Sequence, residues 1–152
     1  MDRDTLEEIR EFAVKKGIEA VQLYSQMASR VQQAHVRSLF EELAEEERKR
    51  RRMLQELDFE GIAASETGEL GPVVKIELSD YLVEQEFRPD MSLQDALILA
   101  LKREEKSWRL YRNLASGTSG ELRKVFDFLA SEEARHNERL QKQYDEGVLT
   151  EN

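Results

Sequence analysis

The segment Leu129-Ala-Ser-Glu-Glu133-Ala-Arg-His136 places two polar side chains on the apolar face of a helix. Glu133 and His136 follow Leu129 by four and seven positions, and Leu140 follows His136 by four. Residues at these spacings share one face of an α-helix, so we expect both side chains to point into the protein. A Glu and a His three positions apart also lie next to each other, which directs two kinds of metal ligand at one point.

Two further carboxylates take equivalent positions elsewhere in the chain. Glu104 lies four residues after Ala100, and Glu47 lies four residues after Leu43, each within an apolar pattern of helical spacing. Unpaired charges buried in an apolar interior cost at least several kcal/mol each, and a bound cation removes that cost. Carboxylates and a neutral imidazole suit iron or manganese, and less decisively zinc. The sequence therefore predicts a metal site that includes Glu47 and Glu104.

Apolar residues recur at helical spacing in four segments, with short links inside each pair of segments and one long connection between the pairs. Thr5 with Glu8, and Ser92 with Asp95, have the spacing of helix N-terminal caps. This arrangement predicts an all-α four-helix bundle of two helical hairpins, in a single domain over residues 1–152. The predicted helices run over about residues 5–32, 34–58, 93–115 and 120–146, and a crossover runs over about 59–92. Residues 76–87 of the crossover could form a short helix, but the sequence does not require one.

Composition narrows the classes of function. The chain of 152 residues corresponds to one domain, and its longest uninterrupted apolar run, residues 96–101, is far shorter than the roughly 20 residues of a membrane span. A net charge of −9 argues against a nucleic-acid partner, and the basic run at 48–52 follows glutamates at the spacing of helix-surface ion pairs. The absence of cysteine excludes thiolate nucleophiles and rubredoxin-type iron sites. We expect a cytoplasmic protein with neither a membrane nor a nucleic-acid partner.

The two halves of the chain are copies of one helical hairpin. Residues 40–47 match residues 126–133 in the pattern Phe-x-x-Leu-Ala-x-Glu-Glu, and Tyr24 corresponds to Tyr111. One half can therefore be compared with the other, position by position. That comparison pairs Glu104 with Gly17 and leaves one of the inward carboxylates without a counterpart.

The sequence resembles the rubrerythrin family of ferritin-like diiron proteins over nearly the whole chain. The segments that carry the resemblance are residues 100–111 (ALKREEKSWRLY) and 129–136 (LASEEARH), with weaker copies around Tyr24 and Glu47. The resemblance implies the ferritin-like fold, in which each iron has one terminal Glu and one His and two further Glu bridge the irons. It implies that Glu104 and His136 are terminal ligands of one metal, and that Glu47 and Glu133 are bridging ligands and the candidate catalytic residues.

The terminal ligands of a second metal are absent, because Gly17 and Arg50 stand at the positions that correspond to Glu104 and His136. We hypothesise that the Arg50 guanidinium fills the volume freed at Gly17 and donates hydrogen bonds to Glu47 and Glu133. It would then provide a fixed positive charge in place of the second metal. One metal would remain, with iron expected and manganese or zinc as alternatives, held by the four ligands named above.

Four other residues have competing explanations. Core packing is the first explanation for Tyr24 and Tyr111, and a hydrogen bond from each hydroxyl to a ligand carboxylate is the second, so both are candidates for contact with the cofactor, as Arg50 is. His35 lies near the first interhelical link and is expected to be exposed or to cap a helix. Trp108 is expected in the core.

The resemblance implies a metal-dependent oxidoreductase that acts on peroxide or oxygen, here with a single metal. It also implies a homodimer, and the absence of cysteine implies that any electron donor is a separate protein. Two alternatives stay open: a non-catalytic metal-binding or iron-handling module, and a metal-free scaffold in which Arg50, the carboxylates and the tyrosines form a hydrogen-bonded cluster. If the Arg50 side chain pointed into solvent, the hypothesis that it replaces a metal would be wrong.

Overall fold

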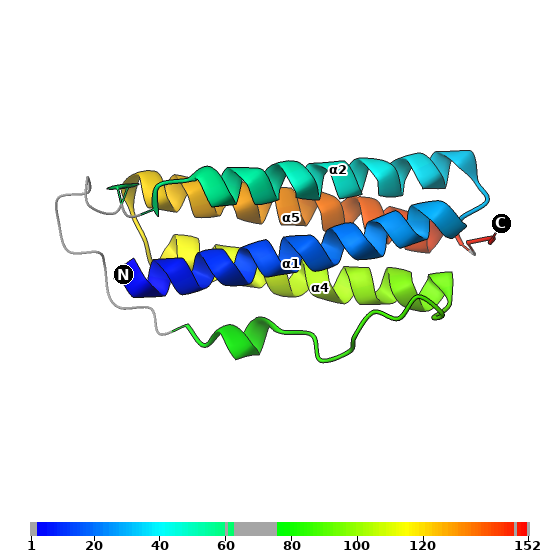
Figure 1. Cartoon of the computed structure of the whole chain (residues 1–152), viewed down its shortest axis with the longest axis horizontal. Coiled ribbons are helices and arrows are strands. Elements are labelled where there is room, and N and C mark those ends of the chain that lie inside the picture. The colour runs from blue at the N-terminus through cyan, green and yellow to red at the C-terminus, as the bar shows by residue number, and fades with distance from the viewer. Residues whose placement is uncertain (1–2, 60, 63–75, 148, 152) are drawn as a thin grey trace.

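The computed structural model describes residues 3–59, 61–62, 76–147 and 149–151. Four long helices account for most of the described chain: α1 (Arg3–Arg30), α2 (Ala34–Glu56), α4 (Leu93–Ser116) and α5 (Gly120–Glu146) (Figure 1). A short 3₁₀ helix, η1 (Leu78–Tyr81), lies in the crossover. The described residues contain no strand, so the predicted all-α four-helix bundle is confirmed.

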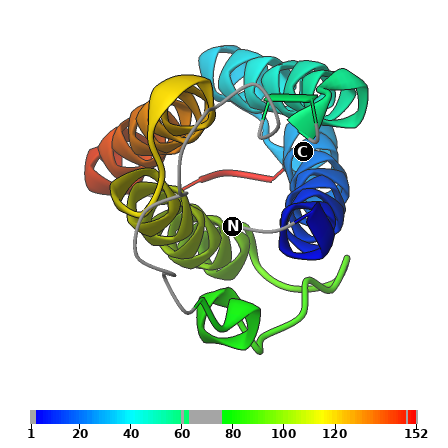
Figure 2. The ribbon, with the colours of Figure 1, turned by 90° about the vertical axis from the view of Figure 1, so that its left-hand side faces the viewer.

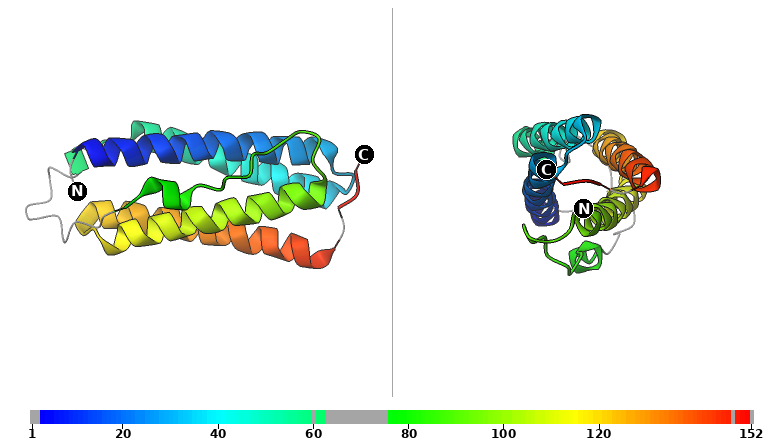
Figure 3. Two further views of the ribbon diagram at one scale, coloured as in Figure 1. Left: turned by 90° about the horizontal axis from the view of Figure 1, so that it is seen from below. Right: turned by 90° about the vertical axis from the view of Figure 1, so that its right-hand side faces the viewer.

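The helices form two hairpins around a common axis, as the end-on view in Figure 2 shows. α1 and α2 are joined by residues 31–33, and α4 and α5 are joined by residues 117–119. The described residues 76–92 of the crossover run along the bundle on the side of α1 and α4 (Figure 3). It is fixed there by hydrogen bonds from Lys16 Nζ to the Tyr81 carbonyl (3.2 Å) and from Lys106 Nζ to the Asp80 carbonyl (3.1 Å).

One of the two predicted helix caps is present. The backbone N–H of Asp95 donates to the Ser92 side chain at 3.0 Å, at the start of α4. α1 already includes Thr5 because it begins at Arg3, so the expected cap at Thr5 and Glu8 does not mark its start. Leu6 is buried and packs the first turn against the core, and the helix therefore begins before Thr5.

The apolar core consists of two clusters with a polar layer between them. One cluster contains Leu43 and Ala100, and the other contains Leu54 and Leu110. On α2 and α4 the positions between these residues are where the inward glutamates occur, so the polar layer lies midway along the bundle. None of the helices in the described part of the chain is long and apolar enough to cross a membrane.

Two aromatic residues, Trp108 and Tyr144, lie at the edge of the buried stripes. Trp108 is only half-buried, and the guanidinium of Arg112 lies 5.2 Å from the centre of its ring. Tyr144 is 39% exposed, while its neighbour Gln143 is buried. The expected core position of Trp108 is therefore wrong. Its helix buries Ser107 and so turns the adjacent indole toward the surface.

Candidate metal centre

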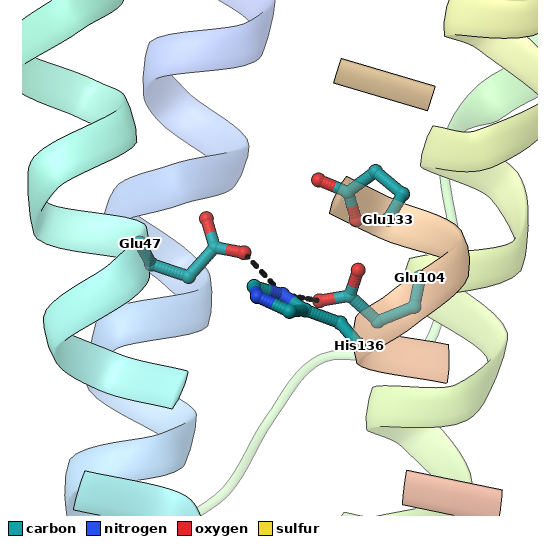
Figure 4. Close-up of side chains that lie close together, drawn as sticks. All are labelled: Glu47, Glu104, Glu133 and His136. Atoms are coloured by element: carbon teal, nitrogen blue, oxygen red, sulfur yellow. Dashed lines mark ion pairs between the residues drawn. The ribbon is translucent and has the colours of Figure 1, made fainter. Parts of the chain in front are cut away.

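Four ligand-type side chains converge in the polar layer from three helices (Figure 4). Glu47 comes from α2, Glu104 from α4, and Glu133 and His136 from α5. Each offers one ligand atom, and these atoms lie within 4.8 Å of one another. All four residues are buried, with exposed fractions of 0–4%. The described residues thus contain a buried group that could hold a metal ion.

The imidazole of His136 is oriented by a carboxylate outside this group. His136 Nε2 lies 2.9 Å from Glu46 Oε2, which favours the tautomer that carries its proton on Nε2 when the ring is neutral. The other ring nitrogen, Nδ1, then faces the centre, 3.2 Å from Glu47 Oε1 and 3.8 Å from Glu104 Oε1. Nδ1 has no aligned hydrogen bond among the described residues, so its lone pair is available to a cation.

The charge state of His136 depends on these neighbours. Burial alone would lower the pKa of His136, but the carboxylates of Glu104 and Glu47 outweigh it and raise the pKa to about 9. Without a metal, the ring is therefore protonated at neutral pH and forms part of the charge balance. A metal at Nδ1 would have to displace that proton.

Arg50 points into the bundle and not into solvent. Its Nη1 donates to Glu47 Oε1 at 3.0 Å and also to Glu133 Oε1, and the residue is only 7% exposed. This is the placement expected from the sequence. The role of Arg50 as a substitute for a second metal stays a prediction.

The expected contact between Arg50 and Gly17 is wrong. A Cβ atom added at Gly17 would lie 3.8 Å from Glu47 Oε2 and 3.9 Å from Arg51 Cβ, with no Arg50 atom within 4 Å. Arg50 instead extends toward α5, because Glu133 and Glu47 attract its guanidinium there. The volume freed at Gly17 remains a small cavity, which Gly17 and Arg50 both line.

The tyrosines differ in their contact with the centre. The Tyr24 hydroxyl donates to Glu104 Oε1 at 2.7 Å, whereas Glu104 Oε2 is buried with no partner among the described residues. Tyr111 is buried nearby, but the described hydrogen bonds of the cluster do not include it. Burial raises the pKa of both phenols, so both stay protonated. His35 is exposed near the first link and lies outside the cluster.

The sequence interpretation missed Glu46. Besides His136, this residue accepts hydrogen bonds from Arg139 Nη1 at 3.1 Å and from Arg135 Nη2 at 3.2 Å. The sequence does contain a signal for Glu46, because the duplicated pattern has two adjacent glutamates in each half, Glu46-Glu47 and Glu132-Glu133. The sequence interpretation assigns only the second Glu of each pair to the site. A helix of 3.6 residues per turn lets the first Glu contact a neighbouring helix beside the buried stripe.

The charges of the cluster fit one divalent cation better than two. The three carboxylates together carry three negative charges, and Arg50 carries one positive charge, so two negative charges remain when His136 is neutral. One divalent ion neutralises them. A second would leave two surplus positive charges in the same buried volume, at a high desolvation cost.

Comparisons with known proteins agree with this architecture. Residues 95–152 match the family model described as Rubrerythrin. The fold matches the crystal structure of a protein from Thermotoga maritima described as a ferritin-like diiron-carboxylate protein, with 20% identity and a TM-score of 0.66. That match covers 94% of this chain and 96% of the other. No curated protein matches the sequence. The second hairpin is thus similar to the rubrerythrin family, and the fold match shows the same four-helix fold over nearly the whole chain.

Proposed function

We propose that this protein is a rubrerythrin-type oxidoreductase that acts on peroxide or oxygen through one iron ion, with Arg50 in place of a second metal. The observation that carries the proposal is the convergence of Glu47, Glu104, Glu133 and His136 within 4.8 Å of one another inside an apolar bundle. Orphaned polar atoms at Glu104 Oε2 and His136 Nδ1 support it, because a cation would satisfy both.

Each residue has a definite part in the proposal. When bound, the iron would exchange one electron at a time with substrate and reductant. Glu104 and His136 would hold it at one end, oriented by Tyr24 and Glu46, while Glu47 and Glu133 would complete the ligand set on the side of Arg50. Arg50 would hold these two carboxylates in place through its hydrogen bonds.

The reduction of peroxide to two water molecules consumes two electrons and two protons. A single iron that cycles between its ferrous and ferric states stores one electron, so the reaction needs a reductant that delivers electrons in sequence. These 152 residues contain no cysteine and so hold no rubredoxin-type site. We therefore propose a separate redox protein as the donor.

Metal stoichiometry tests the proposal most directly. Anaerobic titration with ferrous iron or with manganese, followed by metal analysis, is expected to give one ion per chain. The double substitution Gly17→Glu with Arg50→His would restore the missing ligand types and is expected to give two. An added Cβ at Gly17 meets its neighbours at ordinary contact distances, and Gly17 also lines a cavity of about 30 Å³.

A wild-type chain that binds two ions, or none, would contradict the single-metal proposal. Turnover needs its own test, in which peroxide consumption by the iron-loaded protein is compared with that of Glu133→Ala and His136→Ala. We expect both variants to lose the activity. Consumption that continues unchanged in both would exclude this centre as its source.

The internal charge balance favours a second candidate, a metal-free ferritin-like scaffold. Arg50 neutralises part of the cluster, protonated His136 neutralises another part, and Tyr24 donates to Glu104. Three carboxylates with two cations leave a single net negative charge. A chain that takes up no metal, yet is strongly destabilised by the loss of Arg50, would support this candidate.

A further inference from the structure

The missing side chain at Gly17 leaves a small cavity between α1 and α4 that leads to the metal-ligand cluster. Its volume is about 30 Å³, and Glu47, Glu104 and Glu133 line it on the inside. Lys16 and Arg103 also line it, and both are only partly buried, so the cavity reaches the surface at these two residues. We call it the Gly17 notch.

The outer part of the Gly17 notch is positively charged. Three cationic residues, Lys16, Arg51 and Arg103, line it together with one acidic residue, Glu19. The charge of the outer part of the notch is therefore opposite in sign to that of the carboxylates at its inner end.

Arg103 holds a free donor at this position. Its Nη1 is buried and has no hydrogen-bond partner among the described residues. Lys16, by contrast, already donates to the Tyr81 carbonyl at 3.2 Å. A buried guanidinium nitrogen without a partner is costly, and an anion or a water molecule in the notch would satisfy it.

The volume of the notch limits what can bind. About 30 Å³ corresponds to roughly two water molecules, which admits an inorganic anion of two or three heavy atoms and excludes an organic substrate. We propose that the Gly17 notch is a binding site for such small anions, with Arg103 as the principal ligand and Lys16 as a supporting charge.

This inference goes beyond the proposed function, because peroxide and oxygen are uncharged at neutral pH whereas this site would take an anion. The carboxylates of Glu47, Glu104 and Glu133 would repel an anion, so it would be held at the outer end of the notch, beside Arg103. Arg103 is a positioning residue in this scheme, and its effect is on binding and not on the chemistry at the metal.

Azide is a suitable probe, since it is a linear anion of three atoms. We expect calorimetric titration of the metal-free protein to show one azide per chain, and Arg103→Gln to weaken binding about tenfold. Arg103→Lys should recover part of the affinity by keeping the charge. The matched control is Arg109→Gln, because Arg109 lies on the same helix, pairs with Glu105 and is outside the notch.

Filling the notch offers a second route that leaves all charges in place. Gly17→Leu would direct a side chain into the cavity and is expected to abolish azide binding, while circular dichroism verifies the fold. Wild-type protein without azide binding, or Arg103→Gln with wild-type affinity, would overturn the inference. Since these titrations use metal-free protein, failure of iron loading or of peroxide turnover would leave their outcome unaffected.

Discussion

Arg50 is the residue on which the buried charge balance depends most. Replacement by Met would leave Glu47 and Glu133 buried without their cation, and the loss of one partner of such a group costs about 3–5 kcal/mol. We expect urea denaturation of metal-free Arg50→Met to show a loss of this size. Arg52→Met is the control, because Arg52 lies on the same helix with its side chain 55% exposed. Equal stability of the two variants would contradict the assigned role.

His136 gives the metal-free protein a specific dependence on pH. Its pKa is about 9 in the folded state, above the ordinary value of about 6.5. The protonated ring therefore stabilises the folded state fully below about pH 6.5, and this stabilisation is lost as the pH rises through 9. The shift corresponds to roughly 3 kcal/mol.

We expect the difference in unfolding free energy between wild type and His136→Gln to shrink by about that amount from pH 6 to pH 10, in the presence of a chelator. The exposed His35 provides the control for the loss of an imidazole outside the cluster, through His35→Gln. A difference that stays constant across this range would contradict a raised pKa for His136 in the folded protein.

At the level of single helices, the N-terminus of α4 depends on one side chain. Ser92 accepts a hydrogen bond from the Asp95 N–H, so Ser92→Ala should lower the unfolding free energy by about 1 kcal/mol. Ser119 precedes α5 in the same way but makes no capping hydrogen bond with its side chain. Thermal denaturation of Ser119→Ala should therefore give a much smaller change, and equal losses would argue against the cap.

Gly17 weakens the interior of α1. Glycine inside a helix costs roughly 0.5–1 kcal/mol relative to alanine. A Cβ here would meet its neighbours at 3.8 Å or more, so Gly17→Ala should stabilise the protein by about that amount in urea denaturation. The same methyl group would narrow the Gly17 notch. A destabilised variant would indicate that the backbone at Gly17 cannot tolerate a side chain.

For the molecule as a whole, much of the fold follows from the sequence. Strong 3.6-residue periodicity and short links specify the two hairpins, and the duplicated frame identifies Glu47 and Glu133 as inward-facing residues at corresponding positions. Periodicity does not predict how deeply the residues at the edge of each buried helix face are buried. Trp108 lies there and is half-buried, because a helix face has no sharp edge and a large amphipathic ring tolerates partial exposure.

The candidate site was also predicted only in part. The spacing predicted which residues gather and that Arg50 donates to Glu47 and Glu133. It did not predict the contact between Glu46 and His136, or that Arg50 stays more than 4 Å from a Cβ placed at Gly17, because side-chain rotamers depend on neighbours from other helices. The sequence predicted the structure of the crossover less well. The short helix that the sequence did not decide between residues 76 and 87 is η1, and Gly68 and Pro72 lie outside the described residues.

Glu46 connects the buried imidazole to the outside of the bundle. Its partner Arg135 has a side chain that is 53% exposed, and Arg139 is 28% exposed, so both ion pairs are accessible to dissolved salt. Counter-ions screen such pairs, with a Debye length of about 8 Å at physiological ionic strength. Concentrated electrolyte would weaken the ion pairs between the arginines and Glu46 and strengthen the contact of Glu46 with His136 Nε2, so the buried centre would still respond to the ionic strength of the solution.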